Sequence, residues 1–452
     1  MKPTLKALYT IILAALLAAC GTATPVPAVA VTLTAMPSLA ALSPTALIST
    51  PAIPPATIAP TPTASIPASS APDGLSMAYI TDRNVYFREG SKLPVQLTFS
   101  GEDNRILFFS ENGEKIFFFR GFRDHSLYSI NIDGSQEQAL VTNDVLRTFG
   151  ADYDETATPC DPILVPHTQF LLFYTCSHLD ELTTVQEDDL FIIDTDTYQV
   201  RLLFPRGKGG ITYGMVSGGA DYVSPDGNML AMDRPGYIDI VGIDGKMIRH
   251  KLATYTLSEP YPLDPLVYWL SDSNGLILAL PVNVVYDSSP PPLYEVWRYS
   301  LATGAGVPIR LDPPIMGHES TWVSPDGNWI TYSNSEEGSF LGSLRDGHTQ
   351  KIDGLTGPWS PNSVHFVYEV SKPGGPDLYI ASVNDLPILI EDSGFRCWLD
   401  ADRYIYFKSA PHEAPAYVMG EIGKEPVTIL AGNVETMWSY GNVVFHYQPS
   451  SE

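Results

Sequence analysis

One turn motif occurs twice, a hundred residues apart, as "YVSPDGNMLAM" at 222–232 and "WVSPDGNWITY" at 322–332. In the first copy Pro225 fixes φ for the second position of a turn, Asp226 bonds to nearby backbone, and Gly227 supplies a positive φ. The short apolar runs on either side predict strands. The motif therefore predicts a tight β-hairpin, and its duplication indicates a structural repeat rather than an active site.

Two types of hairpin alternate along the chain. Looser copies of the first type lie at 108–119, 163–175, 268–280, 359–368, 398–407 and 437–447. The second type turns mostly at Asp-Gly or a similar pair and lies at 85–98, 127–141, 190–204, 238–252, 296–311, 340–352, 378–390 and 417–430. Their order predicts complete four-stranded units with an incomplete unit at each end.

Four-stranded units of this length are typical of the blades of a β-propeller. The two incomplete units, 85–98 and 437–447, can join by antiparallel pairing. This predicts an all-β fold of four-stranded antiparallel blades, eight in number, closed by N- and C-terminal strands. Residues 77–81 also read as a strand and compete with 442–447 for the second position of the closing blade. Seven blades with spare terminal strands is the alternative.

The repeats resemble a known family. The Ser-Pro-Asp-Gly turn, together with the Leu-Tyr-x-Ile-x-x-Asp-Gly pattern seen at 127–134, is similar to the WD40-like propeller repeat of the TolB family, over about residues 75–447. No Trp-Asp pair ends a repeat, so the eukaryotic WD40 type matches less well. The resemblance implies a propeller of the bacterial cell envelope, and it implies no particular activity because such propellers serve many functions.

The N-terminus predicts export and anchoring. Lys2 and Lys6 precede the apolar run 7–17, as in a secretion signal, and this run is shorter than a membrane span. Leu17-Ala18-Ala19-Cys20 resembles a bacterial lipobox, which implies acylation of Cys20 after cleavage. We therefore expect an extracytoplasmic, lipid-anchored protein, and the absence of Asp after Cys20 permits outer-membrane sorting in a host with two membranes.

No charged residue occurs in 21–72, which consists largely of Ala, Thr, Pro and Ser. Pro-rich segments of this kind favour extended, disordered chain. The predicted organisation is a signal peptide at 1–19, the lipid-anchor Cys and a Pro/Thr-rich tether at 20–74, and the propeller at 75–452.

The chain has 51 acidic and 26 basic residues. This excess of negative charge argues against nucleic acid as a partner, so the membrane is expected to be contacted through the lipid on Cys20 only. The acidic triplet 187–189 is interpreted as a solvated loop end.

The sequence contains no G-x-S-x-G, H-E-x-x-H, P-loop or C-x-x-C motif, and no catalytic residue, metal or cofactor is predicted. The alternative to a binding module is a lyase-, cyclase- or hydrolase-type propeller enzyme acting on an envelope or extracellular polymer. It would use histidines from connections at one face, namely His125, His178, His318 and His412.

Cys160 and Cys176 lie eight residues either side of position 168 in one predicted hairpin. They are expected to face each other across the ladder and to form a disulfide in an oxidising compartment, with two free thiols as the alternative. Cys397 is expected to be a buried free thiol.

The connections between hairpins are longer than the turns within them and should emerge on one face. The long ones are 143–162, 177–188, 205–221, 253–267, 281–294 and 312–320. Loops on a rigid scaffold commonly carry binding, and aromatic residues commonly anchor interfaces. The predicted anchors for a protein or ligand partner are Tyr153, Tyr213, Tyr255, Tyr261, Tyr286 and His318. Simple tolerance of insertions is the alternative.

Overall fold

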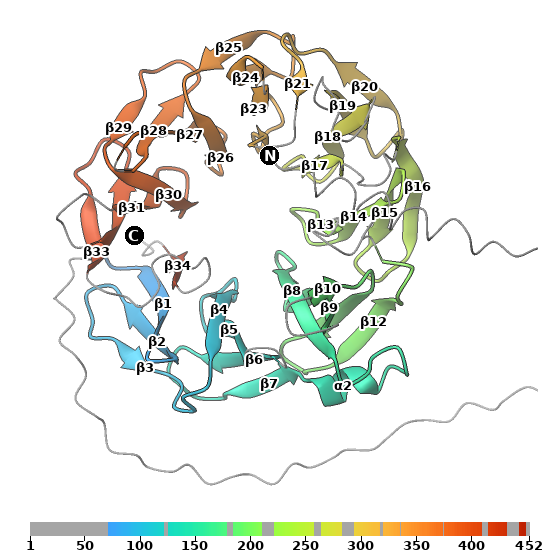
Figure 1. Cartoon of the computed structure of the whole chain (residues 1–452), viewed down its shortest axis with the longest axis vertical. Coiled ribbons are helices and arrows are strands. Elements are labelled where there is room, and N and C mark those ends of the chain that lie inside the picture. The colour runs from blue at the N-terminus through green and yellow to red at the C-terminus, as the bar shows by residue number, and fades with distance from the viewer. Residues whose placement is uncertain are drawn as a thin grey trace, which may run out of the picture. The chain divides into compact units, whose positions relative to one another are not determined.

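The computed structural model describes residues 71–121, 125–178, 184–209, 221–256, 264–282, 293–316, 320–334, 336–373, 375–408, 415–431 and 443–448. The chain divides into two units, Met1–Thr63 and Ala64–Glu452, and every described residue belongs to the second. This unit is a ring of antiparallel sheets arranged around a central axis (Figure 1). The β-propeller fold predicted from the repeats is confirmed.

Five of the sheets contain four strands each. In hydrogen-bonding order they are β34 (Val443–Tyr447), β1 (Leu75–Thr81), β2 (Asn84–Glu89), β3 (Val95–Gln96); β4 (Asn104–Phe109), β5 (Lys115–Arg120), β6 (Ser126–Asn131), β7 (Gln138–Val141); β13 (Asp221–Val223), β14 (Met229–Arg234), β15 (Tyr237–Gly242), β16 (Met247–Thr254); β26 (Leu355–Trp359), β27 (His365–Val370), β28 (Asp377–Ser382), β29 (Ile388–Ile390); and β30 (Ser393–Trp398), β31 (Arg403–Lys408), β32 (Ala416–Glu421), β33 (Val427–Ala431).

Two sheets are larger. One contains β8 (Ala157–Leu164), β9 (Phe170–His178), β11 (Leu190–Asp194) and β12 (Val200–Phe204), with β10 (Thr184–Gln186) paired to β9. The other contains β17 (Leu266–Trp269), β18 (Gly275–Val282), β19 (Leu293–Ser300), β20 (Gly306–Ile309), β22 (Trp322–Val323), β23 (Trp329–Asn334), β24 (Gly338–Ser343) and β25 (Thr349–Ile352), joined through β21 (Ile315–Met316). Split at β21, the described strands form eight four-strand groups, which we number 1 to 8 round the ring, starting from the group of β1.

The repeated motif forms the predicted turn. The Gly227 N–H donates to the Ser224 carbonyl (2.9 Å), and Gly227 has a φ of 70°. The Ser224 hydroxyl accepts from the Met229 N–H (2.9 Å) and donates to the Asp226 carboxylate. The turn is thus closed by side chains as well as backbone, which explains why Ser, Asp and Gly recur in it.

The same turn joins neighbouring groups. The Asp226 N–H donates to the Ser273 hydroxyl in group 5 (3.1 Å), and the Asp326 N–H donates to the Ser363 hydroxyl in group 7 (2.9 Å). On the other side, a Cβ added to Gly227 would collide with the Pro166 carbonyl of group 3. The motif therefore repeats because each copy fits between two neighbours.

Tryptophans near the axis make equivalent links. The indole N–H of Trp269 donates to the Tyr222 carbonyl (2.8 Å), and that of Trp398 donates to the Pro358 carbonyl (3.1 Å). Each bond runs from the first strand of one group to the first strand of the group before it. These half-buried indoles thereby satisfy their donors while they connect the groups.

The closing group differs in one detail from the prediction. β1 pairs with both β2 and β34, so Tyr79 lies opposite Tyr86 on one side and Val443 on the other. Direct pairing of 85–98 with 437–447 is therefore wrong, and the competing strand at 77–81 takes the second position. β1 is buried almost throughout, whereas β34 is mostly half-buried, which agrees with the place of β1 in the interior of the sheet and of β34 at its edge. Residues 437–442 lie outside the described residues.

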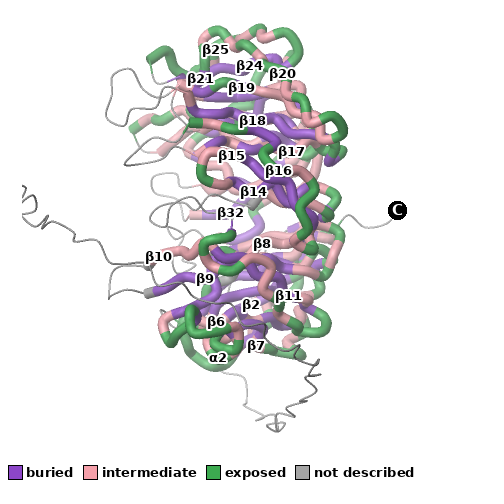
Figure 2. The backbone as a smooth tube through the Cα atoms, turned by 90° about the vertical axis from the view of Figure 1, so that its right-hand side faces the viewer, coloured by how far each residue is buried: buried purple, intermediate pink, exposed green. Residues whose placement is uncertain are grey.

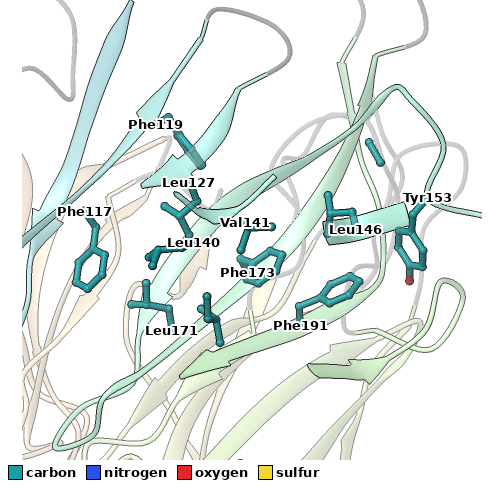
Figure 3. Close-up of a cluster of buried hydrophobic side chains, with 12 residues drawn as sticks. Phe117, Phe119, Leu127, Leu140, Val141, Leu146, Tyr153, Leu171, Phe173 and Phe191 are labelled. Atoms are coloured by element: carbon teal, nitrogen blue, oxygen red, sulfur yellow. The ribbon is translucent and has the colours of Figure 1, made fainter. Parts of the chain in front are cut away.

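Apolar side chains pack between neighbouring groups. Buried residues lie mainly in the strands and exposed ones mainly in the turns (Figure 2). Between groups 2 and 3, the rings of Phe117, Phe173 and Phe191 are all less than 2% exposed. They pack with Leu146 of the short helix α2 (Asn143–Arg147), which the Thr142 hydroxyl caps by accepting from the Val145 N–H (Figure 3). Each group therefore depends on its neighbours for a core.

Candidate functional site

The predicted site residues are only partly within the described structure. Cys20, Tyr213, Tyr261, Tyr286 and His318 lie outside it. Tyr153, Tyr255, Cys160 and Cys176 lie within it.

Cys160 and Cys176 form a disulfide with their Cα atoms 5.7 Å apart, a separation typical of such bonds. The two cysteines were expected to lie directly opposite each other, but they do not. Cys160 pairs with Tyr174, and Cys176 pairs with Thr158. A register shift between Cys160 and Ile163, at the positive-φ residue Asp161, displaces one strand, and the disulfide joins diagonal neighbours. Cys397 is a free thiol, and burial raises its pKa to about 12.

The two faces of the ring carry different connections. On one, the short-turn face, the first strand of groups 2 to 8 turns directly into the second, as at 224–228 and 324–328. On the other, which we call the elaborated face, lie 142–156 before β8 and the described starts of two further connections, 205–209 after β12 and 255–256 after β16. Long loops on one side of a rigid scaffold favour that side as the binding surface.

Tyr153, a predicted anchor on this face, lies in the core. It is 3% exposed, and its ring centroid lies 5.3 Å from that of Phe191, at the edge of the cluster beside Leu146 (Figure 3). The guanidinium carbon of Arg206 lies 5.0 Å from its ring centroid. Burial raises the pKa of its hydroxyl above the usual value. Tyr153 therefore supports the 142–156 connection through packing.

Buried Asp189 and half-buried Arg206 form an ion pair close to this tyrosine. The fully buried carboxylate of Asp189 accepts from the N–H (2.8 Å) and the hydroxyl (2.6 Å) of Thr175, and it lies 3.6 Å from Arg206 Nε. Burial raises the pKa of Asp189, although Thr175 and Arg206 favour its ionised form. The expectation of a solvated acidic triplet is wrong at Asp189, because Arg206 beyond β12 folds back over it.

Arg234 fixes the start of the 205–220 connection. Its Nη1 donates to the Lys208 and Gly209 carbonyls of group 3, and its Nε lies 3.3 Å from the Asp239 carboxylate of group 4. Asp239 is buried and also accepts from the Lys251 N–H (2.9 Å). A planar guanidinium with several donors can bridge such separate acceptors. The connection is thereby held at the junction of two groups.

Tyr255 is half-buried, and its hydroxyl lies 2.7 Å from Asp233 Oδ1 and 2.9 Å from the Arg234 carbonyl. Burial and the neighbouring Asp233 raise the pKa of this hydroxyl. Tyr255 thus ties the start of the 255–265 connection to group 4, and its side chain is committed to that contact.

Arg206 and Arg234 are site residues that the sequence did not indicate. Each lies at or just beyond the end of a strand, in a chain with few basic residues. That position was the only feature of the sequence that could have marked them as site residues. Their acceptors are distant or belong to another group, so no local pattern identifies them. Both act by positioning backbone segments.

His125 lies between groups 2 and 3, with Nε2 2.8 Å from the Pro159 carbonyl and its ring 4.5 Å from that of Phe119. His318 and His412 lie outside the described residues. Within the described part of the chain, no group of three or more His, Cys, Asp or Glu is placed to hold a metal ion. In the same part, no helix has the length and hydropathy of a membrane span.

No protein-family model matches the sequence, and no curated protein does so. Similar solved structures include TolB from Acinetobacter baumannii, with a TM-score of 0.31 and 13% identity over 70% of this chain and 65% of TolB. An oligogalacturonate lyase in complex with manganese has a TM-score of 0.43 and 13% identity over 67% of this chain and 83% of the lyase.

The β-propeller domain of the Trilobed protease from Pyrococcus furiosus has a TM-score of 0.41 and 11% identity over 76% of this chain and all (100%) of that domain. These likenesses are remote and concern the fold alone. The chain has a β-propeller fold, established by its own strand order, and no activity is carried over from these proteins.

Proposed function

We propose that this chain is a lipid-anchored, extracytoplasmic β-propeller of the bacterial cell envelope that binds a protein or ligand partner through its elaborated face. The lipobox-like residues 17–20 and the uncharged segment 21–72 support the anchor and a tether. The Cys160–Cys176 disulfide supports an oxidising compartment, because structural disulfides persist outside the cytoplasm.

The contrast between the two faces carries the binding role. Turns on the short-turn face are closed by their own Ser and Asp side chains and by the next group. On the elaborated face, Arg234 and the Asp189–Arg206 ion pair hold the start of a long connection in place. Burying a carboxylate such as that of Asp189 is costly, so its use beneath a surface connection supports a positioning role for that surface.

The anchor is tested by detergent partitioning of the protein expressed with its signal. The wild-type protein should enter the detergent phase, and Cys20→Ser should leave it in the aqueous phase. Equal membrane association of both proteins would contradict the anchor.

The binding face is tested by site-specific photocrosslinking in cells. A photoreactive residue at Asp154, Lys208 or Thr256, all exposed beside the long connections, should give a discrete crosslinked partner. The same residue at Lys246, Val364 or Glu425, exposed in turns of the short-turn face, should give none. Crosslinks from the second set alone would place the partner on the opposite face and overturn the assignment.

A further inference from the structure

A cavity of about 660 Å³ opens at the junction of groups 5 and 6, on the short-turn face. Three arginines line it, Arg298, Arg310 and Arg345, and Asp346 is the one acidic residue in the lining. The chain as a whole has about twice as many acidic as basic residues, 51 against 26. The cavity therefore reverses the charge of the surrounding protein.

The turn between β22 and β23 holds two of the guanidinium groups. Arg298 Nη2 donates to the Gly327 carbonyl, and Arg345 Nε donates to Asn328 Oδ1 (2.9 Å). Gly327 and Asn328 are consecutive residues of the second Ser-Pro-Asp-Gly-Asn motif, so both guanidinium groups are tethered at one place. Each uses only one of its five N–H donors in that bond, and the remaining donors are available to a ligand.

The opposite wall is fixed by the backbone. A Cβ on Gly347 would collide with the Arg310 carbonyl, and the Thr349 hydroxyl donates to the Asp312 carbonyl, so the turn between β24 and β25 is pressed against residues 310–312. Arg310 itself is exposed, and within the described residues its guanidinium has no hydrogen bond or ion pair. Its charge is therefore available at the mouth of a preformed cavity.

The cavity also offers an apolar surface. Val307 is 62% exposed on β20, beside the arginines, and Leu344 lies buried behind the opposite wall. An exposed branched side chain next to several guanidinium groups suits a ligand that has both anionic groups and a carbon or ester framework.

We propose that this cavity binds a small multivalent oxyanion, a compound with two or more carboxylate or phosphate groups. Guanidinium groups bind both kinds of oxyanion through paired N–H donors. Three guanidinium groups face two carboxylates, Asp346 in the lining and Asp326 beside Arg345, so positive charge is still in excess. The planar N–H forks suit the paired oxygens of a carboxylate or phosphate better than a spherical chloride. This site lies on the opposite face from the proposed partner surface and is independent of it.

The proposal is tested by calorimetric titration of the full chain with tripolyphosphate and with citrate, at matched ionic strength in NaCl. At least one should bind saturably, and the preferred anion assigns the ligand as a polyphosphate or a polycarboxylate. The double variant R310Q/R345Q should weaken binding by about tenfold or more, because two charge-assisted contacts are lost. R201Q removes an exposed arginine from β12 in group 3 and should leave the affinity unchanged within about twofold.

A second double variant, R310K/R345K, keeps the charge but not the planar fork, and it should bind more weakly than wild type and more tightly than R310Q/R345Q. Phenylglyoxal labelling of the unmutated protein gives a measurement free of folding effects: the bound anion should protect Arg310 and Arg345 but not Arg201. Absence of saturable binding of both anions, an equal loss in R201Q, or equal protection of all three arginines would overturn the proposal.

Discussion

Two cavities on the short-turn face differ in how their charges are used. The first, about 630 Å³ between groups 2 and 3, contains Glu111 paired with His167 (2.8 Å) and Lys115 paired with Asp196 (3.1 Å). The second, about 660 Å³ between groups 5 and 6, contains arginines in excess over Asp346. In the first, charged side chains of one group bind those of the next. In the second, backbone carbonyls accept the bonds that join the groups, from Arg298 and Thr349, and the guanidinium groups keep further N–H donors for a ligand.

The turn backbone is shared by the two cavities, so it does not account for the difference. The Ser110 hydroxyl donates to Asn112 Oδ1 (2.7 Å) beside the first cavity, and the Ser324 hydroxyl donates to Asp326 Oδ1 (2.6 Å) beside the second. The side chains that approach from the neighbouring group differ. The repeat thus sets where a cavity forms, and the neighbour decides what it can bind.

The largest effect is expected at Gly347. Its φ is 78°, and an added methyl group would meet the Arg310 carbonyl, so Gly347→Ala should lower the free energy of unfolding by about 4 kcal/mol through strain and overpacking. Gly423 has a φ of 76° in the corresponding turn of group 8 with no atom near the added carbon. Gly423→Ala should cost about 1 kcal/mol. Equal losses of unfolding free energy in chemical denaturation would show that the close contact at Gly347 does not hold the wall of the arginine cavity in place.

A smaller effect is expected in how stability depends on pH, because the turn beside the second cavity contains Asp326 and the turn beside the first contains Asn112. Burial disfavours ionisation of Asp326, but hydrogen bonds from Ser324 and Asn328 outweigh it and lower its pKa below the ordinary 3.8. Its contribution to stability is therefore present above the unfolded-state pKa and is lost as the pH falls through the folded-state pKa. Asn112 occupies the same place beside the first cavity and does not titrate.

Asp326→Asn should thus fold normally and lose about 1 kcal/mol at pH 7 relative to wild type. The two proteins should converge in stability when the pH is brought below the folded-state pKa of Asp326. Urea unfolding at a series of pH values measures this difference. A constant gap down to the lowest pH would mean that the carboxylate charge contributes nothing to the turn.

The smallest effects should have opposite signs at the two cavities. Glu111→Gln breaks an exposed pair with His167 and should destabilise slightly, whereas Arg310→Gln relieves like-charge repulsion and should stabilise slightly, each by less than about 1 kcal/mol. High salt should reduce both differences. A loss of stability in Arg310→Gln would indicate that the guanidinium has a structural role rather than one in binding.

Much of the framework could be predicted from the sequence because it depends on local patterns. Gly227 has its positive φ, the hairpins form, and Cys160 joins Cys176, since each of these features is decided within one hairpin. The position of β1 in the closing group was left open, because two strands of similar length competed for it and only their packing against distant strands decides. Tyr153 was predicted to be a surface aromatic because the sequence does not show that α2 and Phe191 pack around it.

The arginine cavity had no signal in the sequence. Arg298, Arg310 and Arg345 are far apart in the sequence. Arg298 and Arg345 meet only through the Gly327 carbonyl and the Asn328 side chain of another turn. The buried Asp189 was missed for the same reason, because its partner Arg206 arrives from beyond the next two strands. The partners of long side chains that connect groups depend on how the groups pack together. The repeat pattern of the sequence does not contain this information.

Hydrogen–deuterium exchange of the full chain, with and without tripolyphosphate or citrate, tests the contrast between the two cavities most directly. Peptides covering 306–310 and 344–349 should exchange at least about twofold more slowly with the bound anion, because the ligand stabilises the walls that it joins. Peptides covering 110–115 and 167–170, at the cavity with paired charges, should not change. Slower exchange at the second set of peptides, or no change at either, would contradict the account.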